Sequence, residues 1–575
     1  MANTNDDRKR KASTSSQTNN GTDCPYLDTI QRSLLDFDFE PSCSVSLEAG
    51  PHVYGCLVCG KFFRGKGRHT PAYTHSVDEG HYVYVHLSRG TFHCLPDDYE
   101  IQDPSLSDIS AALHPTFSPQ EIRNLDHNTG LARDLFGRRY LPGYVGLNNL
   151  HKTDCVNAIV QALVHVRPLR DFFLQRTHQD LTIETTSKKS SKNNNKPPHR
   201  MSHLALCFGE LVRKIWSDKR FKSHVDPHML IQAISESSKK RFRVGLQAEA
   251  GEFLAWFLNM LHIGLGGSRK PGSSIIYQCF QGKVEVTTRQ RKLKSDEGPT
   301  TLETTENGDT TNPGNKELPP DDDEIEETTT ETTFLQLTLD IPEKPLFRDD
   351  EGGLVIPQEP LVTVLKKFDG MTFSDALSKS GVAQRKRYIL RELPPYLILH
   401  LARFKPNRYS MEKNPTIVAF PVKNLDLGPY TFPKNGKDTP PTEAQVRQMD
   451  VKSLKELLTK YGREDIANHS IEKSELVEAA VNFVTTSLPD LLADKYDLVA
   501  NITHESPADV GREGKHDPLQ EGSYKCHVQH KASNQWYEMQ DLHVQEIMPQ
   551  LIGVSESYVL IFERKSAQVM PSPAM

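Results

Sequence analysis

The chain has 575 residues, a length that corresponds to about four domain-sized units. Hydrophobic residues make up 36% and charged residues 25%, and the mean hydropathy is -0.55, which is typical of globular domains joined by polar linkers. The net charge of -6 gives no overall attraction to nucleic acid, and no apolar run approaches the roughly 20 residues that a membrane span needs. Nine cysteines are too few for a disulfide framework, and the polar N-terminus does not resemble a secretory signal. We therefore expect reduced thiols in the cytosol or nucleus. Together, these observations argue against a secreted, a membrane-spanning and a histone-like protein.

Changes in composition along the chain predict its organisation. Residues 1–25 are polar and basic and predict a disordered tail, in which Arg8–Lys11 is either a nuclear import signal or a solvated basic stretch. Cysteine, histidine and aromatic residues are dense over 40–103, which predicts a small module. A helical connector is expected over 104–140, and a large domain over 141–566.

Three segments interrupt the large domain. The Thr-rich acidic stretch 295–333 and the basic loop 187–200 contain too little apolar surface to order themselves, so we expect disorder in both. Segment 441–488 has leucines at helical spacing, which predicts two short helices inserted as a unit. This pair is either a surface insertion or a small nucleic-acid-binding module. A frayed tail is expected at 567–575.

Between these interruptions, hydrophobic periodicity predicts an α+β domain. Residues 154–166 and 248–261 carry apolar faces at helical spacing. Residues 281–288 and 334–340 alternate as half-buried strands do, and we expect them to pair as a long hairpin. Two further buried strands are predicted, at Tyr396–Leu401 and Tyr558–Phe562.

The small module contains a concentration of potential metal ligands. The candidates are Cys43, Cys56, Cys59, His75, His81 and Cys94. Cys56 and Cys59 are two residues apart, and His75 and His81 have five residues between them, which is a typical arrangement of zinc ligands. A closed zinc site can stabilise a fold that is too small to stabilise itself. We therefore predict structural zinc, while the spacing leaves open which four ligands share an ion and whether a second ion binds. The alternative is a set of core thiols.

Three stretches of this module resemble the ubiquitin-protease-type (UBP-type) zinc finger. They are Cys56-Leu-Val-Cys59-Gly60-Lys61-Phe62-Phe63, His75-Ser-Val-Asp-Glu-Gly-His81 and Cys94-Leu-Pro-Asp97. Members that bind the C-terminus of ubiquitin have Arg where this chain has Lys61, and Tyr54 stands where an aromatic wall residue is usually Trp. Because Lys lacks the planar donor fork of Arg, the resemblance implies a retained zinc fold and does not support a ubiquitin pocket.

The large domain resembles the ubiquitin-specific proteases. Gly146–Leu163 is similar to the family's Cys box, and further matches follow in the family's order. These are Gln247–Leu254, Leu393–Leu397 through Arg403-Phe404, Tyr496–Leu498, Gly522–Tyr524, Trp536-Tyr537 and Tyr558–Phe562. The resemblance implies a papain-like fold with thumb, palm and fingers. It also implies no second zinc at the finger tips, because the region around 280–340 has only Cys279 where active members carry two Cys pairs.

The same resemblance assigns the catalytic positions of the family. It places Asp154 at the nucleophile, Ser523 at the histidine and Gln540 at the orienting group, while Asn149 keeps the oxyanion-stabilising position. A cysteine protease needs a thiolate, a histidine base and a group that orients it, so the resemblance implies a pseudoenzyme with no catalytic residue. Asp154 is expected to cap the start of its helix. Cys155 is rotated by about 100° from the catalytic direction, and we expect it to be a buried core residue.

A narrower resemblance points to a spliceosomal family of tri-snRNP-associated pseudoenzymes. The stretches that carry it are Gly146–Asn149 with Asp154, Phe280–Lys283, Glu412–Thr416, Tyr496–Ile502 and Trp536–Leu542. It implies a nuclear, non-catalytic scaffold that contacts tri-snRNP proteins and has no direct nucleic-acid site, in line with the acidic net charge. Two alternatives remain: a ubiquitin or ubiquitin-like binder, and a deubiquitinase that uses Cys155.

Overall fold

The computed structural model divides the chain into two compact units, which are described separately. The first contains residues up to 116 together with 131–142 and 216–229, and the second contains the rest of the chain. The structure describes residues 24–176, 201–291, 325–343, 347–348, 354–377, 383–406, 411–431, 441–460, 473–487, 494–506 and 517–565. The expected loop 187–200 and the tail 567–575 lie outside these residues, as do 1–23 of the expected tail 1–25.

The first unit is built on a five-stranded antiparallel sheet in the order β2-β1-β3-β4-β5. The strands are β1 Val53–Cys56, β2 Phe62–Arg64, β3 Val83–His86, β4 Phe92–Cys94 and β5 Tyr99–Ile101. Helix α1, Pro71–Asp78, follows β2 and begins with a proline, which suits the first helical position because no N–H is needed there. The short turns η1 Leu27–Thr29 and η2 Arg32–Leu34 precede the sheet in the chain.

The core of this unit extends beyond the predicted module 40–103. Cys24 and Leu35 before the sheet, and Leu106, Ile109 and Leu113 after it, are buried in one cluster with the strands. The expectation that residue 24 belongs to a disordered tail is therefore wrong. A segment with few apolar residues can still adopt a defined structure when those residues are buried in the core of a neighbouring sheet.

The expected helical connector 104–140 is also corrected. Its first part, η3 Pro104–Leu106 and α2 Ser107–Leu113, belongs to the first unit, whereas α3 Pro119–Asn124 and η4 Leu125–His127 belong to the second. The remainder is not helical, because β6 Ala132–Arg133 and β7 Arg139–Tyr140 pair as a short hairpin. Asp134 stabilises this turn by accepting the backbone N–H groups of two residues of the turn through one carboxylate oxygen.

The second unit contains an eight-stranded sheet in the order β10-β16-β25-β21-β22-β23-β24, with β20 paired to β21. The strands are β10 Leu337–Asp340, β16 Tyr396–Ala402, β20 Leu425–Asp426, β21 Lys495–Glu505, β22 Ser523–His530, β23 Gln535–Gln540, β24 His543–Ile547 and β25 Ser557–Arg564. All are antiparallel except β10, which pairs parallel to β16. The predicted strands at 396–401 and 558–562 are confirmed as β16 and β25, which are buried along most of their length.

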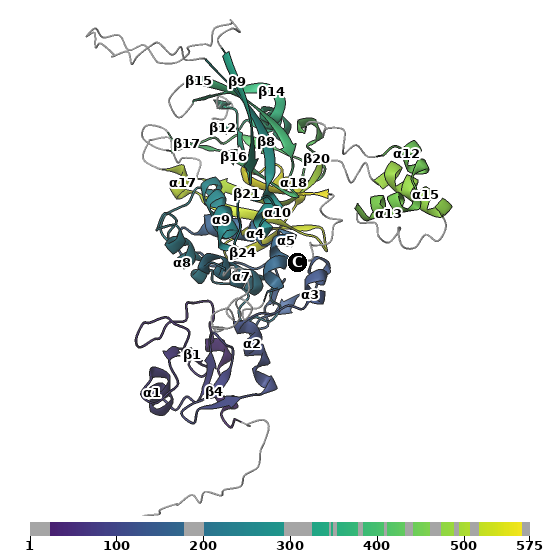
Figure 1. Ribbon diagram of the computed structural model, residues 1–575. Helices are drawn as coiled ribbons and strands as arrows, with labels where there is room; N and C mark the ends of the chain where they lie inside the picture. The colour runs from purple at the N-terminus through teal and green to yellow at the C-terminus, as the bar shows by residue number, and fades with distance from the viewer. Residues whose placement is uncertain are drawn as a thin grey trace, which may run out of the picture. The chain divides into compact units, whose positions relative to one another are not determined.

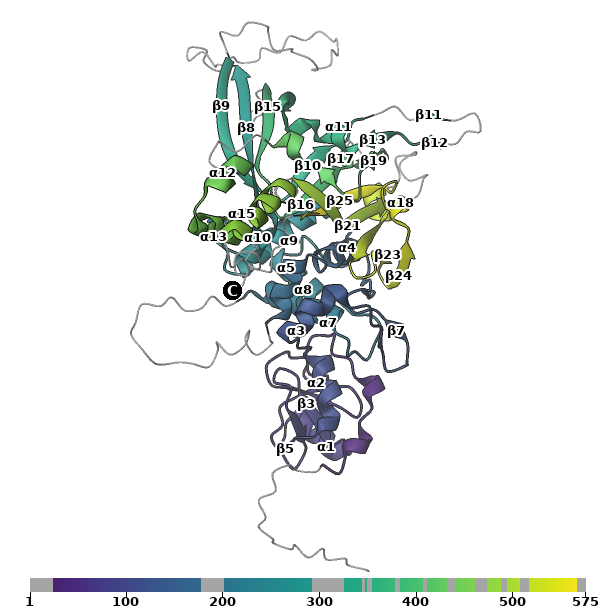
Figure 2. The same cartoon turned by 90° about the vertical axis from the view of Figure 1, so that its right-hand side faces the viewer.

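Six described helices between residues 154 and 280 precede this sheet in the chain, and three of them contact it. The six are α4 Asp154–Leu163, α5 Arg167–Leu174, α7 His203–Trp216, α8 His228–Ser237, α9 Ala250–Gly264 and α10 Ile275–Phe280. Helix α4 contacts β21, β22 and β23, α9 contacts β25, and α10 contacts β16 (Figures 1 and 2). The two predicted helices correspond to α4 and α9, so the α+β class is confirmed. Among the described helices, none combines the length and apolar character required to span a bilayer.

A second, four-stranded antiparallel sheet has the order β14-β15-β8-β9. Its strands are β8 Gly282–Arg291, β9 Ile325–Phe334, β14 Asp369–Leu377 and β15 Ala383–Glu392. Minor elements complete the unit: β11 Phe347–Arg348, β12 Leu354–Val355, β13 Gln358–Pro360, α11 Leu361–Leu365, η7 Lys366–Phe368, β17 Phe404–Pro406, β18 Met411–Lys413, β19 Ile417–Ala419, η8 Gly428–Tyr430, α17 Pro518–Glu521 and α18 Pro549–Ile552.

The pairing of β8 differs from the prediction. Its hairpin partner is β9, in a register from Gly282 opposite Phe334 to Arg291 opposite Ile325, so only Phe334 of the expected segment 334–340 takes part. The expectation of disorder over 295–333 is therefore wrong for 325–333, while 295–324 lies outside the described residues. The β-branched threonines of β9 favour an extended backbone, and its acidic residues find cross-strand partners such as Arg289, which bonds to Glu327 at 2.8 Å.

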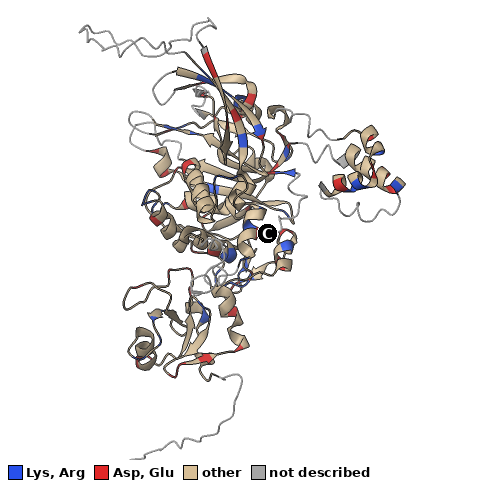
Figure 3. Cartoon of the chain, in the orientation of Figure 1, with Lys and Arg blue, Asp and Glu red and all other residues tan. Residues whose placement is uncertain are grey.

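In the described parts of the inserted segment 441–488, residues 441–460 and 473–487, there are three helices where two were expected. Helices α12 Glu443–Gln448, α13 Val451–Lys460 and α15 Lys473–Asn482 are followed by a π-helical turn, Phe483–Ser487. Their apolar residues form a core of their own that runs from Val446 to Val484. Acidic and basic residues both appear on these helices (Figure 3), so the described helices are of mixed charge.

Candidate functional site

Four of the six predicted metal ligands converge in the first unit. Cys56 ends β1, Cys59 lies in the turn that leads into β2, His75 lies in α1, and His81 lies between α1 and β3. Gly60 closes the turn with a left-handed φ of 74° and donates its N–H to the carbonyl of Cys56 at 2.9 Å. The ligand atoms of the four side chains all lie within 4.8 Å of one another. We call this group the Cys2His2 cluster.

The geometry and donor types of the Cys2His2 cluster fit zinc. Sγ of Cys59 lies 3.4 Å from Nε2 of His75, Sγ of Cys56 lies 3.7 Å from Nδ1 of His81, and the two histidine nitrogens are 3.1 Å apart. An ion with Zn–S near 2.3 Å and Zn–N near 2.0 Å in a tetrahedron would separate S and N ligands by about 3.5 Å, and two N ligands by about 3.3 Å. The observed separations match these values.

The surroundings of the cluster explain why a cation is needed. Burial raises the pKa of Cys56 to about 12 and lowers the pKa of His75, so charge on these side chains is disfavoured without a counter-charge. Phe63 stacks on the ring of His75 at a centroid distance of 4.1 Å and fixes its orientation. When zinc is bound, it stabilises the thiolate form of the cysteines and thereby joins α1 to the sheet.

The other two predicted ligands do not join the cluster. Cys43 lies in the turn before β1, where its sulfur accepts the N–H of Ser46 at 3.5 Å. Cys94 ends β4 and is fully buried beside Cys24 and Tyr99, and burial raises the pKa of its thiol to about 11. Cys94 is a member of the core of the first unit.

In the second unit, the three positions that the family resemblance assigned to catalysis lie on neighbouring elements. Asp154 is the first residue of α4 and is 6% exposed. Ser523 begins β22, and Gln540 ends β23, the adjacent strand of the sheet. The amide of Gln540 approaches the hydroxyl of Ser523 at 3.4 Å. The group contains a carboxylate, a hydroxyl and an amide, but it lacks a thiolate and an imidazole.

The carboxylate of Asp154 is engaged outside its own helix. Its Oδ2 accepts the backbone N–H of Tyr524 at 2.8 Å and the side-chain amide of Gln247 at 2.9 Å. The N-cap of α4 is Thr153, so the expected capping role of Asp154 is replaced by a bond from α4 to β22. Burial raises the pKa of Asp154, although the hydrogen bonds from Tyr524 and Gln247 act in the opposite direction.

A second carboxylate, which sequence reasoning missed, orders the loop before α4. Asp541 follows Gln540 and accepts the side-chain amides of Asn149 at 3.0 Å and Asn157 at 2.9 Å. Asn149 in turn accepts the N–H of Thr153 at 3.1 Å. The backbone of Asp541 is left-handed, with φ of 51°. Asn149 therefore acts as a structural tie between the loop and the β23–β24 turn.

The residues that could replace the missing catalytic groups are occupied elsewhere. Cys155 is fully buried in α4, and burial raises its pKa well above the usual thiol value. Both ring nitrogens of His527 have partners, Asn501 at 3.2 Å and Glu538 at 3.0 Å. Those of His530 contact Ser533 and the carbonyl of Asn128. Both of the histidines that follow Ser523 on β22 are thus engaged with other groups.

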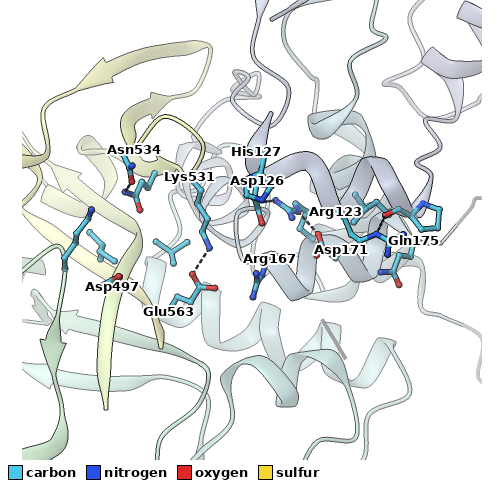
Figure 4. Close-up of a pocket in the computed structure, with 17 residues that line it drawn as sticks. Arg123, Asp126, His127, Arg167, Asp171, Gln175, Asp497, Lys531, Asn534 and Glu563 are labelled. Carbon is cyan, nitrogen blue, oxygen red and sulfur yellow. Dashed lines mark hydrogen bonds and ion pairs between the residues drawn. The ribbon is translucent and has the colours of Figure 1, made fainter. Parts of the chain in front are cut away.

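A cleft of about 740 Å³ lies elsewhere in the second unit, between α3, α5 and the β22–β23 turn. Figure 4 shows Lys531 pointing toward Glu563, to which it bonds at 2.6 Å. Arg170 on α5 pairs with Asp126 at 2.7 Å and Asp171 at 2.8 Å. These opposite charges neutralise one another. Much of the polar lining of the cleft is therefore already paired with other residues of the second unit.

Comparison with known proteins identifies related families. The family model described as "Ubiquitin carboxyl-terminal hydrolase" matches residues 145–562, and the model "Zn-finger in ubiquitin-hydrolases and other protein" matches residues 43–106. The chain is 40% identical over 544 residues to a human protein named "Ubiquitin carboxyl-terminal hydrolase 39", covering 94% of this chain and 80% of that one.

Two further relatives carry names from splicing. The Schizosaccharomyces pombe protein named "Probable mRNA-splicing protein ubp10" is 34% identical over 545 residues, which is 94% of this chain and 88% of that protein. The solved structure described as "Crystal structure of an essential yeast splicing factor" is similar with a TM-score of 0.60 at 21% identity, covering 94% of this chain and 99% of that one. This structural similarity establishes the shared fold.

Proposed function

Because the chain belongs to the ubiquitin carboxyl-terminal hydrolase family and carries its zinc finger, we propose that it is a non-catalytic splicing factor built on the hydrolase fold. A relative named as a probable mRNA-splicing protein matches 94% of the chain at 34% identity, and the human hydrolase 39 protein matches the same share at 40%. We further propose that it works in the nucleus as a scaffold of the tri-snRNP, bound through protein surfaces.

The observation that carries the loss of catalysis is the engagement of Asp154 with Tyr524. In this proposal Asp154, Ser523 and Gln540 occupy the positions of the nucleophile, the histidine and the orienting group. A carboxylate that accepts a backbone N–H cannot supply the thiolate on which cysteine-protease chemistry depends. The bond also joins α4 to β22, so the position has a structural role in the domain.

For the zinc finger, we propose that the Cys2His2 cluster binds one structural Zn²⁺. The separations of Cys56, Cys59, His75 and His81 support this ligand set. Tyr54, which stands at the wall of the family's ubiquitin pocket, is 5% exposed and packs edge-on against His86 at 4.8 Å and His93 at 5.8 Å. This packing supports a module that stabilises structure without binding the ubiquitin terminus.

The test is a tagged purification of the full chain from nuclear extract, with sequencing of the co-eluting small RNAs. The expected result is enrichment of the tri-snRNP RNAs relative to a purification with the tag alone. In parallel, the purified chain is assayed with a fluorogenic ubiquitin substrate, and no hydrolysis above the buffer rate is expected. Ubiquitin conjugates without those RNAs would refute the splicing role and support a ubiquitin binder, whereas Cys155-dependent hydrolysis would refute the loss of catalysis.

A further inference from the structure

Two surface loops of the second unit converge beside Asp154 and are rich in cations. One is the loop before α4, which contains His151 and Lys152, and the other connects α8 to α9 and contains Lys239, Lys240 and Arg243. We call these five residues the basic rim. The α8–α9 loop leads to Gln247, whose amide bonds to Asp154 at 2.9 Å, so both loops end at the same buried carboxylate.

A hydrogen bond links the two loops, and several of their residues have left-handed backbone conformations. The N–H of Gly245 bonds to the carbonyl of His151 at 3.0 Å. Four residues of the basic rim are left-handed, a conformation that side chains other than glycine rarely adopt: His151 with φ of 79°, Lys152 with 56°, Lys239 with 53° and Lys240 with 64°. Such conformations persist where the surrounding structure imposes them, and they concentrate at functional sites.

The positive charge of the basic rim is not neutralised within the described part of the chain. Arg241 is paired with Glu252 across the loop. Across the described residues, Lys152, Lys239, Lys240 and Arg243 have no ion pair and no side-chain hydrogen bond. Lys239, Lys240 and Arg243 are exposed, and Lys152 is half-buried. These cations therefore face solvent and attract acidic groups.

Apolar surface accompanies these charges. Val244 is 47% exposed and Leu246 is 42% exposed in the same loop. Lys152 and Arg243 border a depression of only about 10 Å³, lined by buried aliphatic residues such as Val156, Ile231 and Ile234, so the accessible apolar surface is that of Val244 and Leu246. Phe242, the aromatic side chain of the depression, is 6% exposed and packs against Phe253 and Trp256, so it offers no face on which a nucleic-acid base could stack.

We propose that the basic rim is a docking surface for an acidic segment of a partner protein that places an aliphatic or aromatic side chain on the exposed surface of Val244 and Leu246. Carboxylates of the segment pair with Lys239, Lys240 and Arg243, and the apolar side chain covers Val244 and Leu246. Clustered phosphates of RNA would meet the same cations, but the aliphatic surface favours a peptide. This proposal rests on the geometry of the loops and is independent of the proposed role in splicing.

The test uses the full chain and a fluorescein-labelled peptide with two repeats of Asp-Glu-Leu-Asp-Glu-Phe, and it measures binding by fluorescence anisotropy. The variant K239G/K240G removes two charges at positions whose backbone glycine adopts freely, so its fold is expected to be retained. We expect this variant to bind at least tenfold more weakly than the wild type. The matched control is R269E/K270E, which changes two exposed cations in the loop after α9 and is expected to leave binding unchanged.

Two further probes separate the possible partners. A peptide in which Asn and Gln replace Asp and Glu is expected not to bind, because the cations require carboxylates. A 12-nucleotide single-stranded RNA is expected to bind more weakly than the acidic peptide. The proposal is overturned by absence of peptide binding, by equal losses in the two double variants, or by RNA binding that exceeds peptide binding and depends on Lys239 and Lys240.

Discussion

Oδ2 of Asp154 accepts the backbone N–H of Tyr524 at 2.8 Å, which links the first turn of α4 to the start of β22. These residues are 370 positions apart in the chain. The bond therefore joins segments that are distant in sequence, at the position where the family resemblance expects a catalytic thiol. A buried acceptor with two donors is costly to remove, because the donors lose their partner without gaining water.

Replacing Asp154 with Ala is expected to destabilise the second unit by about 1–3 kcal/mol, because the N–H of Tyr524 and the amide of Gln247 lose this buried acceptor. Asp154→Asn keeps an acceptor oxygen for these donors and is expected to cost less. The measurement is the free energy of unfolding from denaturant titration at pH 7, monitored by a probe in the second unit. Equal losses for the two variants would show that the hydrogen bonds contribute nothing.

The pH dependence of the same pair follows from the raised pKa of Asp154. Because the native state binds this proton more tightly than the unfolded state, the protonated carboxyl contributes stability that is present below its ordinary pKa of 3.8 and is lost as the pH rises through the native value. The Asn variant has no such proton. We therefore expect the stability of Asp154→Asn relative to the wild type to increase between pH 4 and pH 7, and a constant difference would contradict the shift.

Cys155 is expected to be unreactive in the native protein, because it is fully buried and its pKa lies well above the usual thiol value. The measurement is mass-spectrometric mapping of iodoacetamide adducts, together with exposure to a ubiquitin probe that carries a thiol-reactive C-terminus. Cys155 should be alkylated only after denaturation, and the probe should form no adduct. A native adduct that disappears in Cys155→Ser would instead identify a reactive thiol.

Zinc content distinguishes the ligands of the Cys2His2 cluster from the other cysteines. Cys59→Ser and His75→Ala are expected to lose one zinc per chain, because each removes a ligand from a tetrahedral site. Cys43→Ser is the matched control and should retain the zinc, since its sulfur lies outside the cluster. Metal is quantified by plasma mass spectrometry after gel filtration. Loss of zinc in Cys43→Ser with retention in Cys59→Ser would refute the ligand set.

Features encoded by local spacing could be predicted from the sequence. The pairs Cys56–Cys59 and His75–His81 were predicted as metal ligands because two and five residues, respectively, separate their members. The structure brings all four ligand atoms together. Strands β16 and β25 were predictable because short runs of buried apolar residues carry the signal within themselves. In these elements, the residues that determine the structure are neighbours in the chain.

Features that depend on distant partners could not be predicted in this way. Nothing near Asp541 in the sequence indicates that its carboxylate binds Asn149, which is 392 positions away. The pairing of β8 with β9 was missed for a related reason, since the polar threonines and glutamates of 325–333 predict disorder until a partner strand is present. Cys24 was predicted to be part of a polar tail, because the core that buries it is formed by residues later in the chain.

The inserted helices are expected to unfold independently of the sheets, because all the described residues of the cluster that buries Leu454 and Leu458 lie between 446 and 484. Leu458→Asp places a charge in that core. Burying this charge should cost several kcal/mol of folding free energy, which exceeds the stability expected for so small a unit. The measurement is hydrogen–deuterium exchange, with faster exchange expected across α12, α13 and α15 and unchanged exchange in β20 and β21. Lys455→Asp, an exposed change on the same helix, is the matched control and should leave all exchange rates unchanged. Faster exchange in β21 of the Leu458→Asp variant would mean that the insert stabilises the sheet and is not a separate folding unit.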